Sequence, residues 1–175
     1  PYAKKVFVSY KELGGVADKH QEKICEIGNI IRKEILNFNV QPDFNQSEKK
    51  LKILILGGSQ AAKIFAELLP EIFKECIKTK ISLKIYQQCL PEQNKFLSTF
   101  YKDININFEI FNFSNNITDY FTKTNLAITR SGSSMLAELI NAKIPFISVP
   151  LPSSADDHQL KNAIYYEKKG YSYLI

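Results

Sequence analysis

Residues 126–162 read LAITRSGSSMLAELINAKIPFISVPLPSSADDHQLKN. The short apolar run Leu126–Thr129 predicts a buried strand, and helical spacing follows in Met135, Leu136, Leu139 and Ile140. Pro145 precedes a second apolar run over 146–149, which predicts the next buried strand. A strand, a turn, a helix and a strand form a βαβ unit. In such a unit the turn directs free N–H groups past the carboxyl end of the strand, where α/β sheets bind phosphate-bearing ligands.

The turn after the first strand is rich in small, hydroxyl-bearing residues. Gly132, Ser133 and Ser134 can bring N–H groups and hydroxyls to a phosphate, and either serine can cap the helix. Glu138 follows about one turn into the helix, where its carboxylate can accept from two adjacent hydroxyls. Two adjacent hydroxyls are what the ribose of a nucleotide offers, so this turn predicts a nucleotide site.

A loop bounded by Pro150 and Pro152 leads into a second helix that begins near Asp156-Asp157. His158 and Gln159 then lie at the N-terminus of that helix, where they can hydrogen-bond the hydroxyls of a sugar. A buried structural histidine is the alternative interpretation of His158.

These residues together resemble the nucleotide-sugar domain of the MurG family, and the match is carried by Arg130-Ser131-Gly132, Glu138, the proline-bounded strand and Asp157-His158-Gln159-x-x-Asn162-Ala163. The resemblance implies the two-domain GT-B glycosyltransferase fold, in which two Rossmann-like halves face a cleft. It also implies transfer of N-acetylglucosamine from UDP onto an undecaprenyl-linked muramyl-pentapeptide in peptidoglycan synthesis.

Two upstream segments extend the resemblance. Gly28-Asn29-Ile30-Ile31-Arg32 is similar to the segment that joins the two halves in the family, with Ile30 in place of the usual proline. The match implies that Arg32 lies at the nucleotide; without it, a surface arginine is the simpler interpretation. Gly57-Gly58-Ser59-Gln60 follows the apolar strand 51–56 and implies diphosphate contacts from Ser59 and Gln60, although Ala61 replaces a glycine of the family.

The rest of the chain predicts further alternation of strands and helices. A helix is expected from about Ala61, with Pro70 starting a second helical piece. Strands are expected over 82–87 and 105–111, helices over 91–101 and 117–123. The turn 112–116 matches the one that wraps uracil in the family, which places Phe113 and Ser114 there; for Phe113 a place in the core is the alternative. The fold class is therefore α/β, a doubly wound parallel sheet with helices on both faces.

Composition bounds the remaining possibilities. The chain has 175 residues, of which 45% are hydrophobic and 23% charged, as in an ordinary globular domain. Neither a membrane-spanning run nor a signal peptide is apparent, and three irregularly spaced cysteines are expected to be reduced. The net charge of +5 comes from lysines dispersed among acidic residues, so we predict no nucleic-acid partner.

Both ends of the chain look cut, which predicts a fragment of a longer protein. Residues 1–36 are expected to be the tail of an acceptor domain with the interdomain segment, 37–50 a linker, and 51–175 the UDP-sugar domain. We predict neither a metal nor another cofactor, because helix N-termini can stabilise the leaving diphosphate.

A catalytic base cannot be assigned to this chain. The resemblance implies that the base lies in a preceding acceptor domain, so the fragment alone is expected to be inactive. The implied partners are UDP-N-acetylglucosamine, the lipid-linked acceptor and the cytoplasmic side of the bacterial inner membrane, where the protein would be peripheral. Alternatives are a UDP-N-acetylglucosamine epimerase, a split glycosyltransferase subunit, or a non-catalytic nucleotide-binding domain.

Overall fold

The computed structural model describes residues 2–10, 16–38 and 50–175, except for the side chains of 58–62. Six parallel strands form the main sheet: β3 (Lys50–Leu56), β4 (Ser82–Gln88), β5 (Asn107–Phe111), β6 (Leu126–Thr129), β7 (Phe146–Ser148) and β8 (Ser172–Leu174). The helices between them are α2 (Gly58–Lys78), α3 (Asn94–Asp103), α4 (Thr118–Phe121), α5 (Ser133–Asn141) and α6 (His158–Lys168). The predicted α/β class and its alternation of strands and helices are confirmed.

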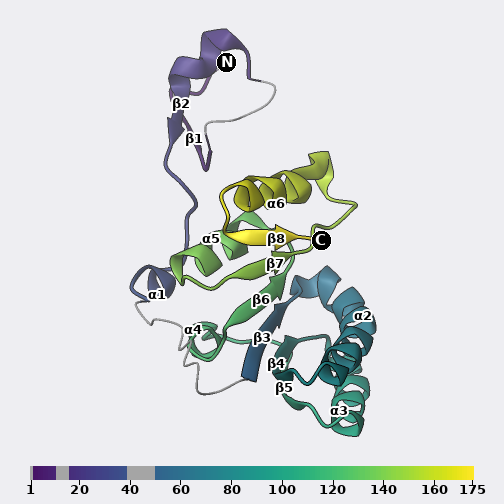
Figure 1. The fold of residues 1–175 in the computed structure, drawn as a ribbon. Helices are drawn as coiled ribbons and strands as arrows, with labels where there is room; N and C mark the ends of the chain where they lie inside the picture. The colour runs from purple at the N-terminus through teal and green to yellow at the C-terminus, as the bar shows by residue number, and fades with distance from the viewer. Residues whose placement is uncertain (1, 11–15, 39–49) are drawn as a thin grey trace.

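The strands lie in the order β5-β4-β3-β6-β7-β8. Numbered from β3, this is 3-2-1-4-5-6, the strand order of the doubly wound dinucleotide-binding fold. The order reverses between β3 and β6, which pair in parallel from Ile53 with Leu126 to Leu56 with Thr129. Figure 1 shows these two strands at the middle of the sheet. A ligand crevice is therefore expected outside the carboxyl ends of β3 and β6.

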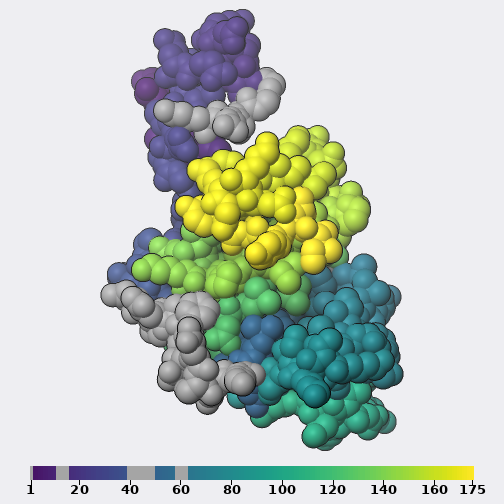
Figure 2. All heavy atoms as spheres, viewed as in Figure 1, coloured from purple at the N-terminus to yellow at the C-terminus, as the bar shows by residue number. Residues whose placement is uncertain are grey.

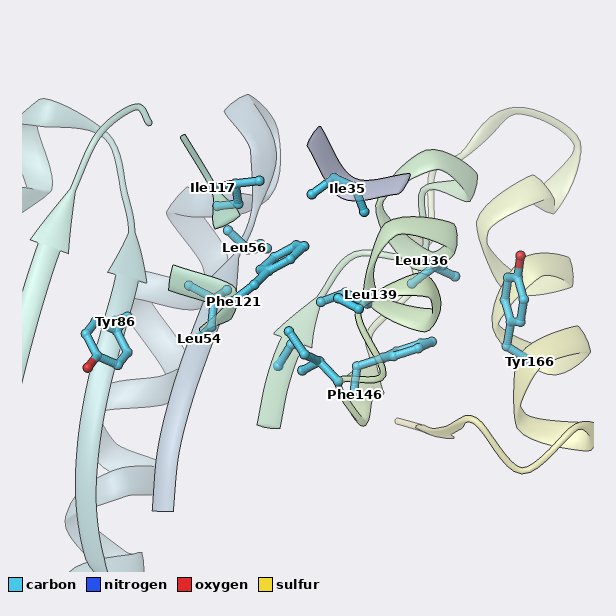
Figure 3. Packing of buried hydrophobic residues seen from close by; sticks show 13 residues of the cluster. Ile35, Leu54, Leu56, Tyr86, Ile117, Phe121, Leu136, Leu139, Phe146 and Tyr166 are labelled. Carbon is cyan, nitrogen blue, oxygen red and sulfur yellow. The ribbon is translucent and has the colours of Figure 1, made fainter. Parts of the chain in front are cut away.

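Two cores lie on opposite faces of the sheet because successive side chains of a strand alternate in direction. Leu54 and Leu56 of β3 belong to a core with α4, α5 and α6, whose labelled members in Figure 3 include Phe121, Leu136, Leu139, Phe146 and Tyr166. Ile53 and Ile55 of β3 belong to the other core, which contains Phe65, Leu69 and Phe73 of α2 and Leu97 and Tyr101 of α3. The near-continuous apolar run of β3 thus serves both faces.

Helix α2 differs from the prediction, because it runs unbroken through Pro70. Phe65, Leu69 and Phe73 lie at intervals of four residues and are all buried. Their packing on the sheet holds α2 as one helix and outweighs the helix-breaking tendency of proline. The predicted break is therefore wrong, and Ile72, two residues beyond Pro70, is 51% exposed on the outer face of the continuous helix.

A smaller parallel sheet precedes the main one and consists of β1 (Val6–Val8) and β2 (Ile24–Glu26), with the short 3-10 helix η1 (Asp18–Lys23) between them. Figure 2 shows these residues, in purple, projecting from the main body of the molecule. The predicted linker falls largely on 39–49, which lies outside the described residues. The division of the chain at residues 36 and 50 stays a prediction.

The segment that follows β2 turns at Gly28, whose φ of +75° suits glycine. It then leads into the short helix α1 (Lys33–Leu36). Ile35 of α1 is fully buried in the core beside α5. Within the described residues, none of the helices is both long and apolar enough to span a bilayer.

Candidate functional site

The candidate site lies at the carboxyl ends of β3, β6 and β7. Thr129, the last residue of β6, donates from its Oγ1 to the carbonyl of Leu56, the last residue of β3, across 3.1 Å. This hydrogen bond joins the ends of the two central strands at the point where the strand order reverses. The loops that leave β3, β6 and β7 therefore start from one edge.

The N-terminus of α5 has backbone donors that no described side chain caps. Gly132 is the N-cap residue of this helix. The expected cap from Ser133 or Ser134 is thus wrong: both serines lie inside the first turn, where their hydroxyls have no protein partner among the described residues. Unpaired N–H groups and the helix dipole make such a terminus suited to an anion.

Gly132 leaves open space in front of this terminus. Its backbone is extended, with φ −70° and ψ 130°, so the conformation itself does not require glycine. A Cβ at Gly132 would meet nothing within 4 Å. A ligand can therefore approach the backbone of the turn closely, which is the property predicted for Gly132 from the sequence.

Glu138 and Arg32 form a bidentate ion pair. The Nε of Arg32 donates to Oε1 of Glu138 across 2.7 Å, and Nη2 donates to Oε2 across 2.5 Å. The Glu138 side chain is only 6% exposed, whereas that of Arg32 is 46% exposed. The hydrogen bond to Glu138 raises the pKa of Arg32, against the opposing effect of burial. The two residues predicted to contact the nucleotide are therefore brought together.

Helix α6 places His158 and Gln159 in its first turn. The Nδ1 of His158 lies 2.7 Å from the carbonyl of Ala155, so the nitrogen that faces this acceptor carries the proton and Nε2 stays exposed. Gln159 accepts the N–H of Leu151 on Oε1 at 3.0 Å, which fixes the loop after β7 and leaves its Nε2 to donate elsewhere. His158 is exposed, so the alternative of a buried structural histidine is wrong.

Phe113 and Ser114 lie in the turn between β5 and α4. Phe113 is 76% exposed, so the alternative that placed it in the core is wrong. The Ser114 hydroxyl accepts the N–H of Asn116 at 3.2 Å and stabilises the turn. The predicted residues Ser59 and Gln60 lie in the first turn of α2, which begins at Gly58. Their side chains are outside the described part of the structure.

Arg130 is a site residue that the prediction left out. Its Nη1 donates to the carbonyls of Val149 and Pro150, at 3.1 and 2.9 Å, and its guanidinium lies 5.1 Å from the ring centroid of Phe65 in α2. Burial lowers the pKa of Arg130, yet an arginine keeps its charge at neutral pH. Arg130 thus links the segment after β6 to the loop after β7 and to helix α2, and its position directly after a buried strand was the available signal.

Asn162 and Ser148 complete the framework behind the turn. Asn162 of α6 donates from Nδ2 to the carbonyl of Ser131 at 3.0 Å. The hydroxyls of Ser131 and Ser148 are both buried and lie 2.8 Å apart. The turn before α5 is thereby attached to α6 and to β7. In the described part of the chain, no group of three or more His, Cys, Asp or Glu side chains is arranged to hold a metal ion.

Comparison with known proteins gives a family match over the part of the chain that forms the main sheet and the candidate site. The model of the glycosyltransferase family 28 C-terminal domain matches residues 52–175. Among solved structures, the crystal structure of Acinetobacter baumannii MurG is similar, with a TM-score of 0.77 and 26% identity. That likeness covers 99% of this chain and 47% of the other chain.

Curated relatives extend the match to the N-terminal residues. A UDP-N-acetylglucosamine–N-acetylmuramyl-(pentapeptide) pyrophosphoryl-undecaprenol N-acetylglucosamine transferase of Pelagibacter ubique is 38% identical over 174 residues, covering 99% of this chain and 48% of the relative. A transferase of the same name from Rickettsia bellii is 37% identical over 166 residues, covering 93% of this chain and 46% of the relative. The chain therefore spans about half the length of the curated relatives it matches.

Proposed function

The chain belongs to the glycosyltransferase family 28 C-terminal domain family, and from that premise we propose that it binds UDP-N-acetylglucosamine as the donor half of a MurG-type transferase. The whole protein then moves N-acetylglucosamine onto an undecaprenyl-linked muramyl-pentapeptide, the acceptor that the names of its relatives imply. The resemblance to the MurG family seen in the sequence is confirmed by these relatives and by the matching fold.

One observation carries the proposal: the uncapped N-terminus of α5 and the Glu138 carboxylate follow the same strand, at the reversal point of the sheet. The free N–H groups suit the diphosphate, and a carboxylate on the same helix suits the ribose hydroxyls. When the bond between the sugar and UDP breaks, negative charge grows on the diphosphate. The N-terminus of α5 stabilises that charge.

The sugar lies toward α6 in this proposal. His158 presents its exposed Nε2 and Gln159 its Nε2 amide group, which can bond hydroxyls of N-acetylglucosamine. Phe113 and Ser114 flank the uracil, and Arg32, Ser59 and Gln60 complete the donor site. No side chain of this chain is assigned as the base that deprotonates the acceptor. Because the acceptor is lipid-linked, the whole protein works at the cytoplasmic surface of the inner membrane as a peripheral protein.

Isothermal titration calorimetry of the chain tests the donor class. We expect UDP or UDP-N-acetylglucosamine to bind more tightly than ADP or NAD. An adenine nucleotide ranked first would contradict the proposal. In a separate assay, the purified chain is expected to transfer no sugar to a lipid-linked acceptor, because the base lies outside it. Turnover by chain free of host enzyme would place the base within these 175 residues.

A further inference from the structure

Glu138 is buried in a way that requires a counter-charge. Its side chain is 6% exposed, and it lies beside the buried Leu139 in the sequence of α5. A carboxylate withdrawn from water is costly unless it is paired and hydrogen-bonded. In this structure Arg32 meets both requirements with a two-pronged contact to the two carboxylate oxygens.

The backbone that carries Arg32 is held independently of that ion pair. Asn141, three residues beyond Glu138 on α5, donates from Nδ2 to the carbonyl of Ile35 at 2.5 Å. The side chain of Ile35 is fully buried, and Figure 3 shows it beside Leu139 and Leu136 of α5. Arg32 therefore reaches Glu138 from a segment already docked on the same helix.

The upstream end of the segment is held as well. Asn29 donates from Nδ2 to the hydroxyls of Tyr10 and Tyr166, at 3.2 and 3.1 Å, and those two hydroxyls lie 3.1 Å apart. Tyr166 belongs to α6 and is buried. The backbone of Arg32 thus lies between two fixed points, Asn29 and Ile35.

Counting acceptor sites shows what remains on Glu138. A carboxylate has two oxygens with about four lone-pair sites, and Arg32 occupies one site on each oxygen. One site on each oxygen is left. These two sites lie on the outer sides of the carboxylate and point apart, so one of them can accept a ribose hydroxyl while the fork stays in place. The fork of Arg32 also fixes the plane of the carboxylate, and therefore the direction of the remaining sites.

We propose that Arg32 is a positioning residue for Glu138: it keeps this buried carboxylate charged and oriented to accept a ribose hydroxyl, and it acts on the nucleotide through Glu138. The inference rests on the proposed donor function, and it makes the interdomain segment a part of the ribose subsite. It differs from a direct contact of Arg32 with the nucleotide, which the family resemblance implies.

The two roles predict different responses to removal of one ribose hydroxyl. The test measures the binding of UDP and of 2′-deoxy-UDP to the wild-type chain and to Arg32→Gln, Glu138→Gln and the double variant. Arg32→Lys keeps a positive charge but lacks the planar fork that fixes both oxygens, so it serves if Arg32→Gln fails to fold. Lys33→Gln is the matched control, because Lys33 is exposed and is the next residue along the chain. Thermal melts confirm that each variant is folded at the assay temperature.

We expect wild type and Lys33→Gln to bind UDP about ten- to a hundredfold more tightly than 2′-deoxy-UDP. Arg32→Gln and Glu138→Gln should each lose most of this preference, Arg32→Lys should lose part of it, and the double variant should be no worse than the weaker single. That non-additivity is the signature of one residue acting through the other.

Four results would overturn the inference. The first is that Arg32→Gln loses the same affinity for UDP as for 2′-deoxy-UDP, and that this loss adds to the loss in Glu138→Gln. Such a result would assign Arg32 a direct contact with the nucleotide. Another is a preference unchanged in Arg32→Gln or Arg32→Lys. A third is tighter UDP binding without Arg32, which would make it a competitor of the ribose. The last is UDP binding by wild type with no preference at all. Failure of wild type to bind UDP would instead reject the proposed function.

Discussion

Asn162 of α6 donates a 3.0 Å hydrogen bond to the backbone carbonyl of Ser131, the residue that precedes the N-cap of α5. This contact joins the helix that carries His158 and Gln159 to the turn that carries Gly132. The two parts of the candidate site therefore share one framework. Its strength can be measured without touching any group that is proposed to contact the ligand.

Asn162→Asp should destabilise the fold by about 1–3 kcal/mol, because the new carboxylate cannot donate to the Ser131 carbonyl and repels it. UDP affinity should fall with it, since the turn is no longer fixed to α6. Urea unfolding and calorimetry measure the two effects. Asn107→Asp makes the same chemical change on the exposed surface of β5 and should alter neither. Equal losses in both variants would mean that added negative charge, and not the lost bond, is responsible.

Gly132→Ala should separate binding from stability. The φ and ψ of Gly132 suit alanine, so the gain of about 0.4–1 kcal/mol through the unfolded chain should offset the poorer N-cap preference of alanine and leave stability nearly unchanged. The added methyl should fill the open space before α5 and weaken UDP binding. Gly170→Ala is the opposite control: Gly170 has a φ of +75°, so alanine should destabilise it and leave binding intact. Unchanged UDP affinity in Gly132→Ala would move the diphosphate away from this turn.

The buried hydroxyls of Ser131 and Ser148 should behave as a pair. Ser131→Ala or Ser148→Ala alone leaves one hydroxyl buried without a partner and should cost about 1–3 kcal/mol of unfolding free energy. The double variant removes both hydroxyls, so its cost should be smaller than the sum of the two single costs. Chemical denaturation of the four proteins completes the cycle. Strict additivity would show that the hydroxyls contribute independently.

Ile35 and Leu36 test whether the segment before the main sheet is part of its core. Ile35 is fully buried and Leu36 is 60% exposed, although they are neighbours. Ile35→Ala should cost about 2–5 kcal/mol, while Leu36→Ala should change stability by less than about 0.5 kcal/mol. Thermal or urea unfolding checks both. Similar, small losses of stability in both variants would show that the segment is not part of the core.

Alkaline pH should destabilise the fold in part through Cys89. Burial, with a smaller contribution from Glu92, raises the pKa of the Cys89 thiol from 9.0 to about 11. Because the folded state holds this proton more tightly than the unfolded state, the stabilisation is complete below pH 9 and is lost as the pH rises through 11. Unfolding free energies measured at several pH values between 8 and 11 should therefore fall, and Cys89→Ala should give a shallower slope. Burial also raises the pKa of Tyr120 to about 12, so the unfolding free energy of the variant should still fall with pH, though less steeply. An identical slope in both proteins would contradict the assignment.

The order of strands and helices could be predicted because it is written in local patterns. The run from Ile53 to Leu56 is apolar on both faces of β3, and turn residues bound each strand. Pro70 shows where local preference failed: the burial of Phe65, Leu69 and Phe73 depends on a sheet that no window of α2 contains. Packing decided the course of α2 against the preference of one residue.

In the candidate site, too, local features could be predicted and contacts between distant residues could not. Gly132 and Glu138 could be located because a strand, a turn and a helix specify where each lies. The pairing of Glu138 with Arg32 could not, because the two residues are 106 positions apart and only the folded chain brings them together. The resemblance placed both near the nucleotide, but neither spacing nor composition indicates that they contact each other.

The strand order also has a consequence for how the chain reaches its native state. The described ladders of the main sheet join strands that are consecutive along the chain, except for β3 with β6, whose cross-strand bond links residues 73 positions apart. The sheet is thus two local units, 50–111 and 126–174, joined by one distant seam, and such non-local pairing is the slow part of folding. Because the proposed donor contacts loops from both units, it binds only chains in which the seam has closed. Donor binding therefore favours the joined state by mass action, and the concentration of donor in the cell becomes a determinant of how long the two units stay together.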